Sequence, residues 1–138
     1  MIVVDTSVAV KWFVAEDETP DAFALLSRAI IAPDLLQVEL GHVLTKKVRR
    51  GEIVEDHARG SFGDVIALLS LLPTRPYGSL AFQLSLDLKH SIYDCYFLAL
   101  AIEHGLMLVT ADRRFARKVA ATRHAPLVVA LGDVLPHG

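Results

Sequence analysis

Short apolar runs alternate with longer segments of helical periodicity along this chain, and this alternation restricts its fold more than any other feature. The runs are rich in β-branched and other apolar residues and lie at residues 2–4, 30–33, 106–110 and 127–130. A further strand fragment is expected just before Pro73. Apolar strands separated by helices are typical of a parallel sheet that is covered on both sides. We therefore predict an α/β fold with a central parallel sheet of about four to five short strands and helices on both faces.

Helices are predicted wherever apolar residues recur at helical spacing between these runs. The first is expected to begin just after Asp5, and the others cover residues 19–29, 35–50, 55–69, 79–90, 91–104 and 112–121. Thr19, which precedes a proline, is the expected cap of its helix, while Gly51 and Gly105 are expected to end two others. The 138 residues match the length of one domain and contain no linker, so we predict a single domain over residues 1–138.

Charge and cysteine content exclude several classes of protein. A formal net charge of −2 excludes a uniformly basic nucleic-acid binder, although it leaves room for a local basic patch. The one cysteine, Cys95, permits neither an intramolecular disulfide nor a zinc cluster of several thiolates, and we expect it to be a small core residue. The histidines lack the spacings of a zinc site. The chain shows no signal peptide and no apolar run of membrane length, so a cytoplasmic protein is expected.

Four acidic residues stand in positions where chemistry is expected. Asp5 directly follows the first strand, and Asp112 comes two residues after the strand that ends at Thr110. Because functional sites of open parallel sheets form beyond the carboxyl ends of the strands, both acids should face the same edge. Asp94 and Glu39 lie among apolar residues of two predicted helices. Burying unpaired carboxylates is costly, and a hard cation such as Mg²⁺ or Mn²⁺ would compensate for it.

Each acid also has a structural explanation. Asp5 and Asp112 are suitable helix caps, and Ser91 together with Asp94 fits a variant capping box. Glu39 lies in the middle of a helix, where its structural alternative is a buried ion pair with a lysine or arginine. The joint pattern of the four acids, and none of them alone, indicates a metal site.

The four acids lie within segments that resemble one known family. The segments are Asp5-Thr6-Ser7 after the first strand, Glu39 within LLQVELGHVL, Asp94 within IYDCYFLALA, and Thr110-Ala111-Asp112 followed by two arginines. Over the whole chain, the order of these motifs is similar to that of PIN-domain ribonucleases, most of all the small VapC-type toxins of toxin–antitoxin pairs.

This resemblance implies a site in which Asp5, Glu39, Asp94 and Asp112 hold one or two Mg²⁺ or Mn²⁺ ions. By the same resemblance, Thr6 and Thr110 are hydroxyl residues that support those acids. We expect Asp5 and Asp94 to be direct metal ligands, Asp112 to bind directly or through water, and Glu39 to orient or deprotonate water.

Two positions depart from the family pattern. His42 stands where the family often has Asn, and Arg113 and Arg114 stand where some members have a further acid. Whether the site holds a second metal therefore stays open.

Two basic clusters could attract RNA to this acidic site. One cluster ends a predicted helix and includes Lys46 and Arg49, and its alternative explanation is a solvated face at a helix C-terminus. The other consists of Arg113, Arg114, Arg117 and Lys118 and directly follows Asp112. The second cluster is better placed to bind an RNA substrate.

The leading hypothesis is a metal-dependent endoribonuclease that acts as a toxin and is neutralised by a cognate antitoxin protein. The alternatives are a non-catalytic PIN-like protein that binds RNA or an antitoxin, and a phosphoryl-transfer receiver domain. The placement of Glu39 and Asp94 on helices argues against the receiver domain. A homodimer is also expected, because the chain is rich in apolar residues and some of them, such as Val8, Val10, Trp12 and Phe13, could lie near the surface.

Overall fold

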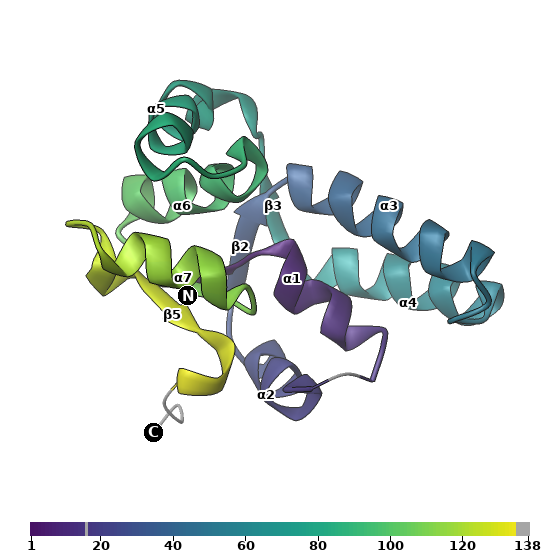
Figure 1. The fold of residues 1–138 in the computed structure, drawn as a ribbon. Helices are drawn as coiled ribbons and strands as arrows, with labels where there is room; N and C mark the ends of the chain where they lie inside the picture. Colours follow the sequence, from purple (N-terminus) through teal and green to yellow (C-terminus); the bar gives the residue numbers. More distant parts are fainter. Residues whose placement is uncertain (16, 135–138) are drawn as a thin grey trace.

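The computed structural model describes residues 1–15 and 17–134 and builds them around one parallel sheet (Figure 1). Within these residues the sheet has five strands in the order β3-β2-β1-β4-β5, and every neighbouring pair is parallel. The strands are β1 (Ile2–Val4), β2 (Ile30–Pro33), β3 (Ser70–Leu72), β4 (Leu108–Thr110) and β5 (Val128–Ala130). The predicted α/β fold with a sheet of four to five short strands is therefore confirmed.

The connections between strands are helical, as predicted. The α-helices are α1 (Thr6–Ala9), α2 (Thr19–Ala24), α3 (Leu35–Arg49), α4 (Glu55–Leu68), α5 (Gly78–Leu88), α6 (Ile92–His104) and α7 (Arg113–Ala120). Short 3₁₀ turns extend α1 over Val10–Trp12 and α2 over Leu25–Ser27, and others occupy Arg75–Tyr77, Ala125–Leu127 and Leu131–Asp133. The strand order reverses its direction after β3, so right-handed crossovers, which are the rule for parallel strands, would put the helices before β3 and those after it on opposite faces. Figure 1 accordingly shows α3 and α4 apart from α5 and α6.

Strand β1 occupies the centre of the sheet. Its residues pair with β2 on one side, where Val3 lies opposite Ile31, and with β4 on the other, where Val4 lies opposite Val109. All residues of β1, β2 and β4 are buried, which explains why they read as continuous apolar runs. The carboxyl ends of β1 and β4 consequently lie side by side at one edge of the sheet.

Helix α6 forms the centre of the core on one face. It contacts β1, β2 and β4 and packs against α5 on its other side. Because α6 is enclosed from both sides, Phe97, Leu98 and Leu100 are fully buried, and Cys95 is buried with them. The prediction that Cys95 is a core residue is confirmed.

The structure corrects two expectations about the N-terminal third of the chain. Val8, Trp12 and Phe13 lie in the core instead of near the surface, and the Trp12 indole donates a hydrogen bond of 2.8 Å to the Ala22 carbonyl. They therefore give no support to a homodimer. Thr19 does not cap α2 either, because Glu18 occupies the cap position and adopts a left-handed conformation.

The predicted helix ends at glycine are present. Gly51 follows α3 with a φ of 74°, and Gly105 ends α6 with a φ of 63°, a conformation that glycine adopts without steric cost. None of the helices in the described residues combines the length and the apolar character needed to cross a membrane.

Candidate functional site

Asp5 lies at the end of the central strand and is almost completely buried. Its Oδ1 atom accepts hydrogen bonds from the Ser7 hydroxyl at 2.5 Å and from the Val8 backbone N–H at 3.3 Å, and the latter bond caps α1. Its Oδ2 atom accepts a hydrogen bond of 2.5 Å from the Thr110 hydroxyl. The pKa of Asp5 is raised from 3.8 to about 7, chiefly by burial, to which the nearby charge of Asp94 adds, while the hydrogen bonds from Ser7, Thr110 and the Val8 N–H act in the opposite direction.

A network of hydroxyl groups joins the ends of β1 and β4. Ser7 Oγ accepts a hydrogen bond of 2.9 Å from the Ala111 backbone N–H, and Thr110 Oγ1 accepts one of 3.0 Å from the Asp112 N–H. Thr110 is fully buried. The network therefore fixes Asp5 relative to the start of α7, and it places Thr110 beside the acid that it was predicted to support.

Asp112 is the N-cap of α7. Its Oδ1 atom accepts a hydrogen bond of 3.0 Å from the Phe115 backbone N–H and so caps the helix. Both Asp5 and Asp112 therefore cap helices, as their structural explanation predicted. Neither excludes metal binding, because each carboxylate retains further lone pairs.

Asp94 lies in the first turn of α6 and its partner is a histidine. Ser91 caps the helix by accepting from the Tyr93 N–H, whereas the Asp94 Oδ2 atom lies 2.5 Å from His90 Nε2. Asp94 therefore does not complete the predicted capping box. His90 was missed in the sequence, where its spacing of four residues before Asp94 was the available signal.

Glu39 lies in α3 and is half-buried. The Thr6 hydroxyl donates a hydrogen bond of 3.0 Å to its Oε1 atom, so in the described part of the chain its partner is Thr6 and not the cation of a buried ion pair. Burial raises the pKa of Glu39, and the charge of Asp94 raises it further, against the effect of the Thr6 hydrogen bond.

These side chains form one acidic site around Asp94. Single ligand atoms of His90, Asp94 and Asp112 all lie within 4.8 Å of one another, a spacing that can hold a metal ion. The charge of Asp94 also acts on both Asp5 and Glu39, which places all three carboxylates in one electrostatic neighbourhood. The carboxylate oxygens of Asp94 and Asp112 are hard ligands that suit a divalent cation of the Mg²⁺ or Mn²⁺ type.

The basic residues near the acids differ in their availability. Arg113 forms an ion pair of 3.1 Å with Glu18, and Lys118 donates to the Lys89 carbonyl at 2.9 Å and lies 3.2 Å from His90 Nδ1. Arg114 and Arg117 are exposed on α7. Arg113 is exposed as well, but its guanidinium is engaged by Glu18, whereas Lys118 is half-buried.

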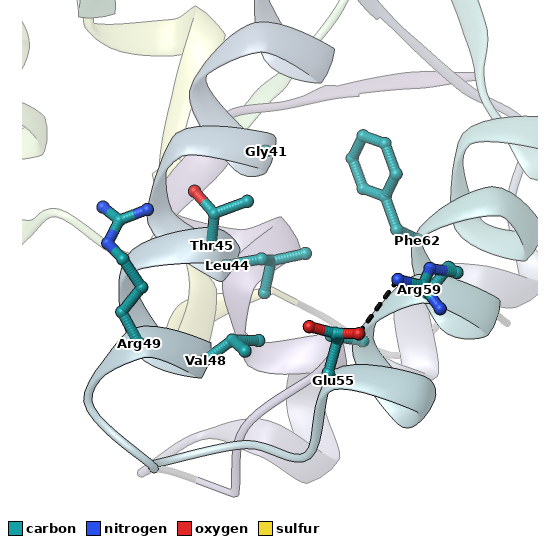
Figure 2. A pocket seen from close by; sticks show the side chains of 9 residues that line it. Gly41, Leu44, Thr45, Val48, Arg49, Glu55, Arg59 and Phe62 are labelled. Carbon is teal, nitrogen blue, oxygen red and sulfur yellow. Dashed lines mark hydrogen bonds and ion pairs between the residues drawn. The ribbon is translucent and has the colours of Figure 1, made fainter.

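The other predicted basic cluster lies at the opposite end of α3. Lys46 and Arg49 follow Glu39 by seven and ten residues, which corresponds to about 10 and 15 Å along a helix axis. Arg49 lines a groove of about 350 Å³ between α3 and α4, to which Leu44 and Phe62 also contribute (Figure 2). This position is remote from the acids, and it weakens the expectation that Lys46 and Arg49 bind RNA at the same site.

Comparisons with known proteins agree on one family. A family model described as PIN domain matches residues 2–121. A curated protein named Ribonuclease VapC3, from Pyrobaculum aerophilum, is 31% identical over 125 residues, which cover 87% of this chain and 95% of that protein. Ribonuclease VapC1 from Mycobacterium tuberculosis is 35% identical over 88 residues, which cover 62% of this chain and 64% of the relative.

Solved structures show the same fold. A crystal structure of a protein from Pyrobaculum aerophilum matches with a TM-score of 0.70 and 21% identity, covering 95% of this chain and 83% of that one. A toxin–antitoxin complex from Klebsiella pneumoniae matches with a TM-score of 0.65 and 19% identity, covering 97% of this chain and 100% of the other.

Proposed function

Because the chain belongs to the PIN-domain family, with VapC ribonucleases among its relatives, we propose that it is a metal-dependent endoribonuclease and the toxin of a toxin–antitoxin pair. The observation that carries this proposal is the convergence of Asp5, Glu39 and Asp112 on Asp94 at the carboxyl edge of the sheet. A purely structural role would require only that individual acids cap helices, and it would not require Glu39 and Asp94 to be brought to the same place.

We propose that Asp5, Asp94 and Asp112 hold the metal ion, Mg²⁺ or Mn²⁺, with Asp112 bound either directly or through water. A divalent cation at this place supplies charge neutralisation for the phosphate and lowers the pKa of water. Without a cation, the carboxylates would repel both one another and the phosphate backbone. Metal is therefore required for substrate binding as well as for chemistry.

The residues around the metal position have distinct proposed roles. Ser7 and Thr110 fix both oxygens of Asp5 and leave it little freedom to rotate. Glu39, oriented by Thr6, is the proton acceptor for the attacking water, since its raised pKa brings the carboxylate closer to the range in which general bases work. Arg114 and Arg117 contact the RNA backbone, because they are exposed on the helix that begins at Asp112.

The partners of the protein are also part of this proposal. We propose a cognate antitoxin that inserts a basic or aromatic segment toward the acids, where an arginine could neutralise them in place of the metal. The support comes from the solved toxin–antitoxin complex that shares this fold and from the acidic site itself. A homodimer remains a proposal that rests on the apolar composition and on the frequency of symmetric dimers.

The test is cleavage of single-stranded RNA by the purified chain with Mn²⁺ or Mg²⁺ and with excess EDTA. Glu39→Gln keeps the shape and the acceptor for Thr6 but removes the base, so the cleavage rate should fall by about 100-fold or more. Glu103→Gln is the matched control, because Glu103 is exposed at the far end of α6. Metal-independent cleavage, or equal rates for the two variants, would contradict the proposal.

A further inference from the structure

A chain of polar contacts runs from α7 to Asp94 through His90. Lys118 Nζ lies 2.9 Å from the Lys89 carbonyl oxygen, to which it donates, and 3.2 Å from His90 Nδ1. On the other side of the ring, His90 Nε2 lies 2.5 Å from Asp94 Oδ2. The ammonium group of Lys118, the imidazole of His90 and the carboxylate of Asp94 thus form one continuous chain of contacts.

The chemistry of the lysine decides which nitrogen of His90 carries the proton. A lysine ammonium group can only donate hydrogen bonds, so Nδ1 of a neutral His90 must accept from Lys118. The ring proton then resides on Nε2, from which it is donated to Asp94 Oδ2. In this tautomer Nε2 has no lone pair for a metal ion, although its position lies within ligand distance of Asp94 and Asp112.

Packing holds the ring in this orientation. The His90 side chain is only 10% exposed, and its ring lies against Phe115 with the centroids 4.7 Å apart. Phe115 is fully buried in α7. Phe115 on one face of the ring and the contacts at both ring nitrogens therefore hold the ring in this orientation.

We propose that His90 is a positioning residue, which fixes Asp94 through Oδ2 so that the other carboxylate oxygen faces the metal ion, and that Lys118 holds His90 in the required tautomer. This inference rests on the proposed function and adds two residues to its site. It also gives Lys118 a role in place of the predicted contact with RNA. Partners of this kind orient metal ligands, and their loss typically lowers metal affinity by about 10–100-fold.

The test measures Mn²⁺ binding to the metal-free full chain by isothermal titration calorimetry, so its readout is independent of cleavage. His90→Leu should weaken binding by about 10–100-fold. His90→Gln should retain most of the affinity, because the side-chain amide can donate to Asp94 from nearly the same position as Nε2. Thermal melting by circular dichroism identifies any variant that fails to fold.

Lys118→Met distinguishes a positioning histidine from a histidine that binds the metal itself. If Lys118 fixes the tautomer, its loss should weaken Mn²⁺ binding while the fold is retained. If His90 were itself a ligand, loss of Lys118 would free Nε2 and leave the affinity unchanged or higher, which would overturn the inference. Arg123→Met is the matched control, since it removes the same charge from an exposed position after α7 and should not alter binding.

The outcomes separate this inference from the proposed function. Wild-type protein that neither binds Mn²⁺ nor cleaves RNA would overturn both. Wild-type protein that binds Mn²⁺ as tightly as a folded His90→Leu variant would overturn only the role of His90.

Discussion

Replacement of Asp5 by asparagine should make the metal-free protein more stable at neutral and alkaline pH, although it removes a residue of the proposed site. The asparagine oxygen can still accept from Ser7 and from the Val8 N–H, and its amide group can donate to Thr110 Oγ1. Size and hydrogen bonds are therefore retained. The variant no longer has to bury a negative charge at this position, so the free-energy cost of that burial is removed.

The size and sign of the effect follow from the pKa of Asp5. This pKa is raised from 3.8 to about 7, chiefly by burial, which corresponds to roughly 4 kcal/mol between the two protonation states. The folded state binds the Asp5 proton more tightly than the unfolded state does. This difference contributes fully to the free energy of unfolding below pH 3.8, and the contribution is lost as the pH rises through about 7. At pH 8 the variant should thus gain about 2–4 kcal/mol, with local relaxation accounting for the lower figure.

The assay is urea unfolding in EDTA at pH 5 and pH 8. Between these two values wild type should lose stability, and Asp5→Asn should lose much less, with a remainder that comes from Glu39, whose pKa is also raised. Asp64→Asn, at an exposed position of α4, is the control and should behave like wild type. An Asp5→Asn variant with the pH dependence of wild type would show that Asp5 does not carry the buried charge.

Three further results are expected. Asp94→Asn should lose RNA cleavage while its melting temperature without metal holds or rises, because one of several repelling carboxylates is removed; earlier melting with wild-type cleavage would support a purely structural role. Combined Arg114→Ala and Arg117→Ala substitutions should weaken RNA binding and reduce its salt dependence, measured by fluorescence anisotropy, whereas Lys46→Ala should change neither. Light scattering at micromolar concentration should give the mass of a dimer, and a stable monomer mass would contradict the proposed assembly.

The sequence predicted the fold well because its signals are local. Buried parallel strands such as β1 and β4 consist almost entirely of apolar residues. Two of the helices between them, α3 and α6, are followed by glycines with a positive φ angle, a backbone conformation that favours glycine and can therefore be recognised in the sequence. Thr19 misled the prediction, because a threonine before a proline has the residue types of a cap, yet Glu18 takes that position and the Thr19 hydroxyl donates to the Val14 carbonyl.

The site was predicted less completely, because its contacts join distant parts of the chain. Asp5 and Asp112 could be placed at one edge from topology alone, and both also cap helices, so the two explanations were compatible from the start. His90 could not be chosen among six histidines, since its role depends on Lys118, which lies 28 positions later. Trp12 and Phe13 could not be assigned to core or surface because periodicity does not show which face of a short helix is covered.

The central position of β1 has a consequence for the protein during its own synthesis. Asp5 emerges from the ribosome before its partner Thr110, which lies 105 positions later, at the end of the neighbouring strand. At roughly 5–20 residues per second, several seconds pass in which β1 has no β4 to pair with. A chain that still lacks Asp112 cannot assemble Asp5, Asp94 and Asp112 at one edge of the sheet. If these residues form the proposed site, a growing ribonuclease of this topology cannot cleave the messenger RNA that encodes it until most of its length has been made.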